Sequence, residues 1–381
     1  MIIRNVKIFD DKKEIVFGDI VTASGRITKI CIKESEKIAP ESDDDILDGT
    51  GLTAIPGLVD IHFHGAMGHD FCDSDIEGLK EIARYEIEHG VTSICPATMT
   101  FPEDVLSNIM SVAKEYASDS PELVGVNMEG PFISEKKIGA QNPKYVHKAD
   151  VAMFERLQQV SGNLIKLVDI APEVDGAFEF IEKCKDKVKI SIAHTAADYE
   201  TADKAFKIGA RHVTHLYNAM NPIHHRKPGP VIAALDNKAE VELIADGVHI
   251  DEAMVRFTFS SFDKDKIILI SDSMEATGLP DGEYQLGGQP VIKKGNLATL
   301  KDDTDTVAGS VTNLFDCMKT AVKMGVEFKD AVVAATINPA KAIGIDKDAG
   351  SIEVGKYADI LLVDDELNIR YVVSKGKILN S

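Results

Sequence analysis

The sequence predicts an α/β protein, a (β/α)₈ barrel of the TIM type with a small β-sandwich domain formed by the N- and C-terminal segments. Eight short apolar runs alternate with helical stretches in the middle of the chain, which is the rhythm of a parallel barrel. Both ends of the chain instead show closely spaced strand-like runs and turns. The length of 381 residues leaves room for a second domain, because a barrel takes roughly 250 residues.

The two ends of the chain are expected to pair into one small β domain. Turn signals such as Ser24-Gly25 and Asp48-Gly49 separate the N-terminal runs, and the acidic stretch 41–45 is expected to be a solvated loop. Residues 1–54 and 346–381 are therefore assigned to the β-sandwich domain and residues 55–345 to the barrel. The expected strands are 2–9, 19–22, 26–32, 52–55, 358–364 and 369–373.

The central runs are short and almost continuously apolar, as parallel strands buried on both faces are. Between the first two runs, Ile76, Leu79, Ile82 and Ala83 recur at helical spacing, and Gly90 ends the pattern. A doubly wound sheet is the alternative arrangement. A final helical region is expected at 311–324 and 329–335. The eight runs are 55–63, 91–97, 123–128, 165–170, 188–193, 211–215, 241–245 and 266–270.

The composition excludes several classes of protein. Acidic residues number 62 against 42 lysines and arginines, a net charge of −20, which disfavours binding to nucleic acid or to an anionic membrane. An anionic substrate would need cations placed locally. The five cysteines are widely spaced without a C-x-x-C pair, and no apolar run is long enough to span a membrane. We therefore expect a cytoplasmic protein.

Polar residues with metal-binding chemistry follow five of the eight runs, at the end where barrel enzymes carry their catalytic groups. Each alone has an ordinary explanation, such as a chance H-x-H pair, a surface acid or a helix cap. Their joint order indicates a divalent metal site, because imidazole and carboxylate groups are its usual ligands. Asp272, after the last run, suits a base that accepts a proton from water. The residues are His62, His64, Glu129, His194, His215 and Asp272.

This order resembles the amidohydrolase superfamily, and three longer stretches resemble its N-acetylglucosamine-6-phosphate deacetylases. They are Glu129-Gly-Pro-Phe132 with Gly139-Ala-Gln-Asn-Pro143, His215-Leu-Tyr-Asn-Ala-Met220, and Ala245-Asp-Gly-Val-His249. Ala308-Gly-Ser310 and residues 54–62 also fit, so the similarity covers essentially the whole chain. The resemblance implies metal-dependent deacetylation of N-acetylglucosamine 6-phosphate, in amino-sugar catabolism and cell-wall sugar recycling.

The resemblance also implies a role for each site residue. Glu129, His194 and His215 match metal ligands, and Asp272 matches the catalytic acid/base. His62 and His64 stand where some members have other residues, so the chain is expected to hold one or two divalent ions, of zinc, iron, manganese or cobalt. The implied substrate contacts are Ala140, Gln141, Asn218, Ala219, Arg226, His249, Ala308, Gly309 and Ser310.

Two of these contacts have further consequences. Arg226 and His249 match residues that hold the sugar phosphate, and the resemblance implies a homodimer in which one of them reaches the partner subunit's site. Gln141 replaces a histidine of some members, and glutamine can donate a hydrogen bond to an oxyanion but carries no positive charge.

Other functions stay open on the sequence. The N-acetylgalactosamine 6-phosphate isomer is an alternative substrate. A cyclic amidase or nucleobase deaminase is disfavoured, because Glu129 takes the place of a bridging lysine and the phosphate-binding residues favour a phosphosugar. A non-catalytic scaffold is disfavoured because every expected ligand is present.

Overall fold

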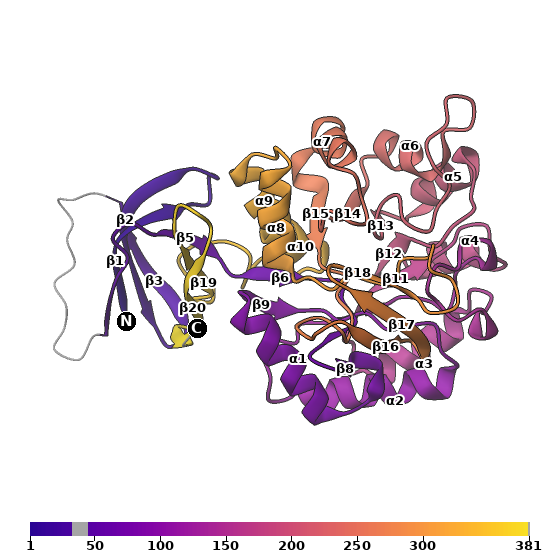
Figure 1. Cartoon of the computed structure of the whole chain (residues 1–381), viewed down its shortest axis with the longest axis horizontal. Helices are drawn as coiled ribbons and strands as arrows, with labels where there is room; N and C mark the ends of the chain where they lie inside the picture. The colour runs from indigo at the N-terminus through magenta and orange to yellow at the C-terminus, as the bar shows by residue number, and fades with distance from the viewer. Residues whose placement is uncertain (33–44, 380–381) are drawn as a thin grey trace.

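The computed structural model describes residues 1–32 and 45–379. Figure 1 shows a β-sheet unit that contains both ends of the chain beside a larger body of strands and helices. The acidic loop predicted at 41–45 lies, except for Asp45, outside the described residues.

The larger body is built on parallel strands that follow the chain in order. Six of them form one sheet, β10-β11-β12-β13-β14-β15, and β6 and β9 form a separate parallel pair. Each of the eight predicted runs overlaps one of these strands. Because the order of the six-stranded sheet does not reverse, the doubly wound alternative is wrong for these strands. The bounds are β6 (Leu58–Asp60), β9 (Val91–Ile94), β10 (Val126–Met128), β11 (Ile165–Ile170), β12 (Lys189–Ile192), β13 (His212–Val213), β14 (Glu240–Ile244) and β15 (Ile267–Ile270).

Isolated contacts connect the pair to both edges of the six-stranded sheet. Parallel bridges pair Ile94 with Leu123 and Ala97 with Asn127, which joins β9 to the β10 side. At the other edge the backbone N–H of Asp272 donates to the carbonyl of His62 at 2.9 Å. The regular ladder therefore spans six strands, fewer than the eight of the predicted barrel, and single contacts continue it.

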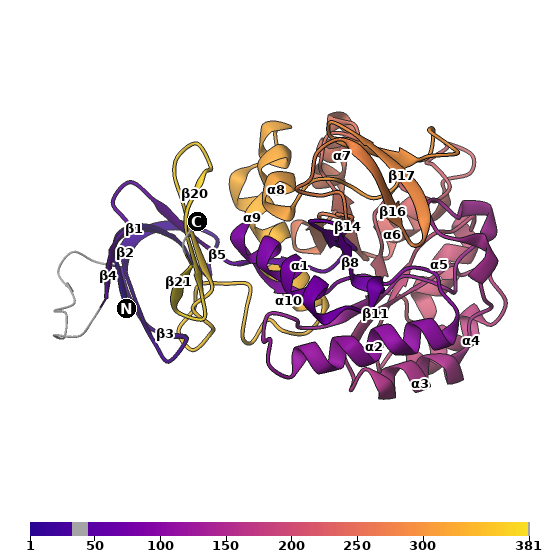
Figure 2. The ribbon, with the colours of Figure 1, turned by 60° about the horizontal axis from the view of Figure 1, so that its bottom comes forward.

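Most of the helices pack against the outside of these strands (Figure 2). Asp75, Asp150, Asp198 and Asp251 begin four of them, and each aspartate side chain accepts from backbone N–H groups of the first turn. The helices are α1 (Ile76–Glu88), α2 (Glu103–Ala117), α3 (Val151–Val160), α4 (Ala177–Cys184), α5 (Tyr199–Ile208), α6 (Gly229–Asp236), α7 (Glu252–Ser261), α8 (Leu314–Lys323), α9 (Phe328–Ala335) and α10 (Ile337–Ala342).

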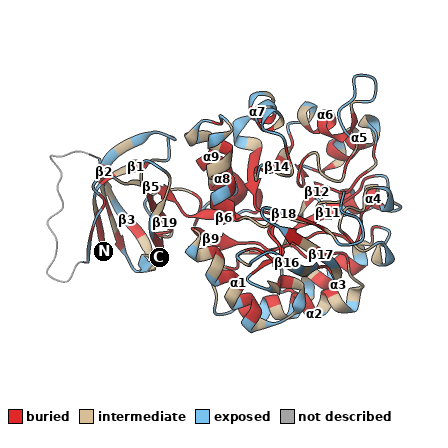
Figure 3. Cartoon of the chain, in the orientation of Figure 1, coloured by how far each residue is buried: buried red, intermediate tan, exposed pale blue. Residues whose placement is uncertain are grey.

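Side chains alternate between two buried layers along the strands. On β14, Val241 and Leu243 belong to the cluster shared with the helices, whereas Ile244 belongs to an inner cluster. Ala340 and Ile343, in and after α10, join that inner cluster. The strands are buried on both faces (Figure 3), as their continuous apolar character predicted.

A three-stranded antiparallel sheet lies between β15 and α8, where the sequence analysis expected none. It contains β16 (Gly282–Leu286), β17 (Gln289–Lys294) and β18 (Leu297–Leu300). Its hairpins turn at Gly287-Gly288 and Gly295, which have positive φ. Leu286 packs with Met99 and Met274 in a small cluster of its own.

The two ends of the chain pair as predicted, but in one sheet of eight strands rather than the two packed sheets of a sandwich. The order is β21-β20-β19-β5-β1-β2-β3, with β4 on β1. The two halves join because β5 pairs directly with β19, so that Pro56 faces Ile360. The bounds are β1 (Ile2–Phe9), β2 (Ile15–Ala23), β3 (Arg26–Cys31), β4 (Ile46–Asp48), β5 (Thr53–Pro56), β19 (Ile360–Val363), β20 (Ile369–Ser374) and β21 (Lys377–Leu379).

This terminal sheet has two buried faces. Ile8, Ile20 and Ile360 belong to a core of its own, whereas Phe9 and Leu361 belong to the large cluster of the α/β body. The predicted domain boundary at residues 54/55 falls inside β5. No helix within the described ranges is both long and apolar enough to cross a membrane.

Leu361 offers a test of this junction. Leu361 is fully buried and packs closely against Gly90 of the α/β body. A Cβ atom added at Gly90 would lie only 2.6 Å from Leu361 Cδ1. Replacing it in Leu361→Ala should lower the free energy of unfolding by about 2–5 kcal/mol, through lost burial and a residual cavity. Val354→Ala, at a site that is 61% exposed, is the control and should change stability by less than about 0.5 kcal/mol. Equal denaturation midpoints for the two variants would contradict the assigned packing.

Candidate metal centre and substrate cavity

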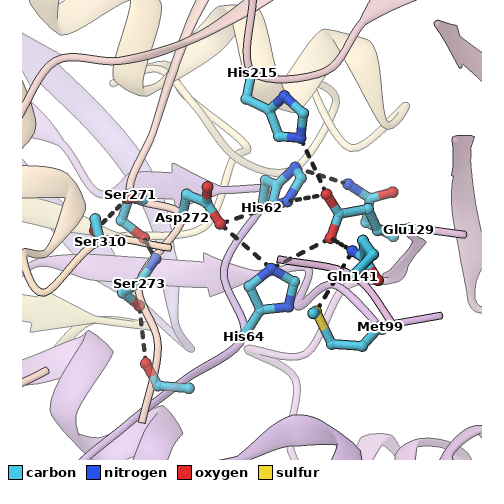
Figure 4. Close-up of polar contacts among 12 residues, drawn as sticks. His62, His64, Met99, Glu129, Gln141, His215, Ser271, Asp272, Ser273 and Ser310 are labelled. Atoms are coloured by element: carbon cyan, nitrogen blue, oxygen red, sulfur yellow. Dashed lines mark hydrogen bonds and ion pairs between the residues drawn. The ribbon is translucent and has the colours of Figure 1, made fainter. Parts of the chain in front are cut away.

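Six polar side chains converge where the parallel strands end. His62 and His64 follow β6, Glu129 follows β10, and the others follow β12, β13 and β15. All six are at most 7% exposed. The structure therefore brings together every metal ligand and the catalytic acid expected from the sequence (Figure 4 draws all but His194): His62, His64, Glu129, His194, His215 and Asp272.

Three of these residues have left-handed backbone conformations. The φ angles are +40° at His194, +30° at His215 and +51° at Asp272. Such conformations cost of order 1–3 kcal/mol in non-glycine residues and persist where the surrounding structure enforces them. The main chain at Asp272 is held by a backbone hydrogen bond from Ser310 (2.6 Å). Ser310 also donates through its hydroxyl to the Ser271 carbonyl at 2.6 Å.

The six side chains form two groups of three. In the first, Glu129 Oε1 lies 3.0 Å from His194 Nε2 and 3.1 Å from His215 Nε2. In the second, Asp272 Oδ1 lies 3.3 Å from His64 Nε2 and 3.8 Å from His62 Nε2. The potential ligand atoms of each group lie within 4.8 Å of one another.

Glu129 connects the two groups. Its Oε2 is 3.3 Å from His64 Nε2, and its Oε1 is 3.6 Å from His62 Nε2 (Figure 4). A carboxylate in this position can contribute one oxygen to each of two ions.

The donor set fits a divalent ion. Two ligand atoms of one tetrahedral ion lie about 3.4 Å apart when the bonds are about 2.1 Å. The Nε2 atoms of His194 and His215 are 3.2 Å apart. His62 Nε2, fully buried, has no hydrogen-bond partner. A buried polar atom without a partner is costly, and a metal ligand bond would satisfy it.

Opposite charges determine the ionisation of the cluster. Burial raises the pKa of Glu129, but the facing histidines, His62 first, more than offset this and hold it well below its ordinary value. Burial likewise raises the pKa of Asp272, but the hydrogen bond from His64 and the histidine charges bring it below its usual value. Both groups are therefore carboxylates at neutral pH.

A cavity of about 280 Å³ opens above the cluster. His64, Glu129, His194, His215 and Asp272 form part of its wall, whereas His62 lies behind them, fully buried. Of the predicted substrate contacts, the cavity is lined by Ala140, Gln141, Asn218, Ala219, His249 and Gly309.

Three predicted contacts lie elsewhere. Ser310 and Ala308 are buried beneath the cavity wall, and the Ala308 N–H donates to the carbonyl of Ala298. Arg226 is exposed and lines a separate hollow with His224 and Lys227. Within one chain, the arginine and the metal cluster therefore do not share a cavity.

Gln141 contacts the metal cluster itself. Its Nε2 donates to Glu129 Oε2 at 2.7 Å, and its Oε1 accepts from the Thr100 N–H at 2.7 Å. Gln289 of β17 donates to the Ala140 carbonyl at 2.6 Å, so the additional sheet supports this loop. One of the two N–H groups of the amide that the sequence analysis considered for an oxyanion is therefore directed to Glu129.

His249 forms a buried ion pair in the cavity wall. Its Nδ1 lies 2.8 Å from Asp246 Oδ2, and both side chains are at most 6% exposed. Burial lowers the pKa of His249, but the hydrogen bond and charge of Asp246 more than offset it, so that the pKa lies above its ordinary value. A partly protonated imidazole here suits an anionic substrate group.

Sequence reasoning missed some residues of the site. Glu242 on β14 contacts His62 from below, and its only signal was an acid within an apolar run, Glu240-Val-Glu-Leu-Ile244. Leu286 and residues 305–307 line the cavity from the β16–β18 region. No local pattern marks them, because their role depends on how a separate sheet folds over the strand ends.

Comparison with known proteins agrees with this geometry. A model of the amidohydrolase family matches residues 53–379. The N-acetylglucosamine-6-phosphate deacetylase of Bacillus subtilis is 35% identical, covering 99% of this chain and 96% of that protein. The N-acetylgalactosamine-6-phosphate deacetylase of Escherichia coli O157:H7 is 32% identical, covering 85% and 86%.

Solved structures extend the similarity to the whole fold. A mutant N-acetyl-D-glucosamine-6-phosphate deacetylase from Mycobacterium smegmatis, in complex with N-acetyl-D-glucosamine-6-phosphate, superposes with a TM-score of 0.93 at 28% identity and covers 100% of this chain and 99% of that chain. The Thermotoga maritima N-acetylglucosamine-6-phosphate deacetylase has a TM-score of 0.87 at 28% identity, covering 100% of both chains.

The first ligand group predicts a measurable metal content. His215→Ala should lower the content of divalent metal by about one ion per chain, because it removes a nitrogen 3.1 Å from Glu129. Elemental analysis of the purified protein measures this, with circular dichroism to verify folding. His147→Ala, an exposed histidine, is the control. Unchanged metal content in the His215 variant would remove this residue from the ligand set.

Proposed function

The chain belongs to the amidohydrolase family, in the group that includes the hexosamine-phosphate deacetylases, and from that premise we propose that it hydrolyses N-acetylglucosamine 6-phosphate to acetate and glucosamine 6-phosphate. The observation that carries the proposal is the Glu129-centred ligand cluster at the base of a cavity of about 280 Å³. The fold proposed with it is a complete (β/α)₈ barrel, in which the β6–β9 pair closes the six-stranded sheet. The single contacts at both edges support this closure.

The two ligand groups would hold one or two divalent ions, with Glu129 between them. Histidine and carboxylate ligands suit zinc, iron, manganese or cobalt. When bound, such an ion supplies Lewis acidity, which polarises the acetamide carbonyl and lowers the pKa of water.

Asp272 carries the proton transfers in this proposal. It lines the cavity and is a carboxylate at neutral pH, so it can accept a proton as water attacks the acetamide carbon. When the C–N bond breaks, Asp272 returns that proton to the sugar nitrogen, and acetate leaves. Gln141 holds Glu129 in place, which leaves polarisation of the carbonyl oxygen mainly to the metal.

The phosphate end of the substrate requires a second copy of the chain. His249 is in the cavity wall, but Arg226 is exposed in a separate hollow. We propose a homodimer in which Arg226 of one subunit reaches the phosphate bound by the other, as an arginine fork suits a phosphate. A cytoplasmic location is proposed as well, because all five cysteines are unpaired.

The galactosamine isomer is a second candidate substrate, because the relative from Escherichia coli O157:H7 carries the name of that activity at 32% identity. The two sugars differ only at one hydroxyl. The residues that separate them would lie in the cavity wall beside the sugar ring.

Acetate release from three sugars tests the function. N-acetylglucosamine 6-phosphate should be the best substrate, ahead of its galactosamine isomer and the unphosphorylated sugar. Asp272→Asn should lower kcat by about 10²–10⁴-fold, the usual contribution of an acid–base group, and should still bind metal through Glu129, His194 and His215. Preference for the galactosamine isomer would reassign the substrate, and absence of release from all three by the metal-loaded protein would refute the proposal.

The Asp246–His249 pair predicts a pH-dependent effect on substrate binding. In Asp246→Asn the anion that raises the pKa of His249 is gone, and burial then lowers it. His249 should lose its charge at a lower pH, so KM should rise more at pH 8 than at pH 6 relative to the wild type, with little change in kcat. Steady-state kinetics across this range measure the effect. An equal KM ratio at both pH values would exclude the charged form of His249 from phosphate binding.

A further inference from the structure

Glu242 is a fully buried acid directly below the metal cluster. It lies on β14, where neighbouring Val241 and Leu243 point to the helices, so its own side chain points to the barrel interior. An ionised group in such an interior is costly unless its partners compensate for lost hydration.

One oxygen of Glu242 contacts residues of both ligand groups. Oε2 lies 3.0 Å from His62 Nδ1 and accepts from the backbone N–H of His215 at 3.2 Å. The contact with His215 involves only its backbone, whereas the contact with His62 involves the ring that would bind an ion. The other oxygen, Oε1, lies 3.7 Å from His212 Nε2 and has no hydrogen-bond partner.

The contact between Glu242 and His62 determines which nitrogen of the His62 ring is available to bind an ion. A carboxylate only accepts hydrogen bonds, so His62 Nδ1 must carry the proton that it receives. In the neutral ring, Nε2 then keeps its lone pair, and this is the atom that faces Glu129 and Asp272 without a hydrogen bond. Carboxylates that hold metal-binding histidines in this way also increase their basicity.

We infer that Glu242 is a positioning residue that fixes the tautomer and direction of the His62 ring and thereby creates the second ion site, His62–His64–Asp272. The inference rests on the metal dependence in the proposed function, but not on the identity of the sugar. It makes ion binding by the second group depend on Glu242 more strongly than ion binding by the first group, Glu129, His194 and His215.

Zinc binding tests this without any substrate. Zn²⁺ is titrated into the metal-depleted full-length protein in competition with a chromophoric chelator. The wild type should bind two ions. Glu242→Gln, which keeps shape and removes charge, should bind the first with unchanged affinity and the second about 10-fold more weakly or worse, within the 10–100-fold range of such partners. Glu242→Leu, which also removes the hydrogen bond, should show the larger loss.

Glu86→Gln is the matched control. Glu86 on α1 is also fully buried, but within residues 1–32 and 45–379 neither of its oxygens has a hydrogen-bond partner. This variant should bind two ions as the wild type does. The control therefore distinguishes the effect of losing a buried acid from the effect of losing the contact between Glu242 and His62.

A double variant locates the effect. His64→Ala removes one ligand of the second group, and Glu242→Gln in that background should not weaken the remaining ion further. Three results would overturn the inference. They are a wild type that binds one ion, unchanged zinc affinities in Glu242→Gln, and an equal loss of affinity for both ions in that variant. The zinc titration contains no sugar, so its outcome does not depend on acetate release. Failure to release acetate would refute the proposed function and leave the role of Glu242 intact. Unchanged zinc affinity in Glu242→Gln would refute the role of Glu242 and leave the proposed function intact.

Discussion

The structure depends on the accommodation of one buried carboxylate, Glu129, among four imidazoles. Each nitrogen lies 3.0–3.6 Å from one of its oxygens. Glu129 could not remain ionised at 2% exposure without them. The four histidines come from three different strand ends, so this requirement fixes how those strands meet. The helices pack around these strands, and the additional sheet contributes Leu286 to the cavity wall above the cluster.

The convergence of these side chains strains the backbone locally. The hydrogen bonds that offset this strain come from residues distant in sequence. Three of the converging residues have positive φ where their strands end. Ser310 holds the main chain at Asp272 and Ser271, and Glu242 holds the main chain at His215. This gives Ser310 a structural role beside the cavity, whereas its neighbour Gly309 lines the cavity itself.

The sequence predicted the parts of the fold that follow from local periodicity. The eight apolar runs, α8 and α9, and the pairing of the two chain ends all appear. The sequence did not show that the two ends share one sheet, because the pairing of β5 with β19 joins segments about 300 residues apart and a strand-like pattern does not reveal its partner. The β16–β18 sheet was missed because β16 and β17 are short, mostly polar and half exposed, so that no apolar run marks them.

For the site, residue type and strand position were enough to find the six cluster residues, but not the groups that orient them. Glu242 and Gln141 act through contacts across the strand ends, so their roles appear only in three dimensions. The charge of the cavity also becomes apparent only in three dimensions. None of the described residues that line it is lysine or arginine, and the chain carries a net charge of −20. Among the described residues that line the cavity outside the metal cluster, His249 is the one that can carry a positive charge, and Asp246 raises its pKa. A phosphate dianion needs more positive charge than a single imidazole supplies, and within one chain Arg226 lies at another hollow and does not line this cavity.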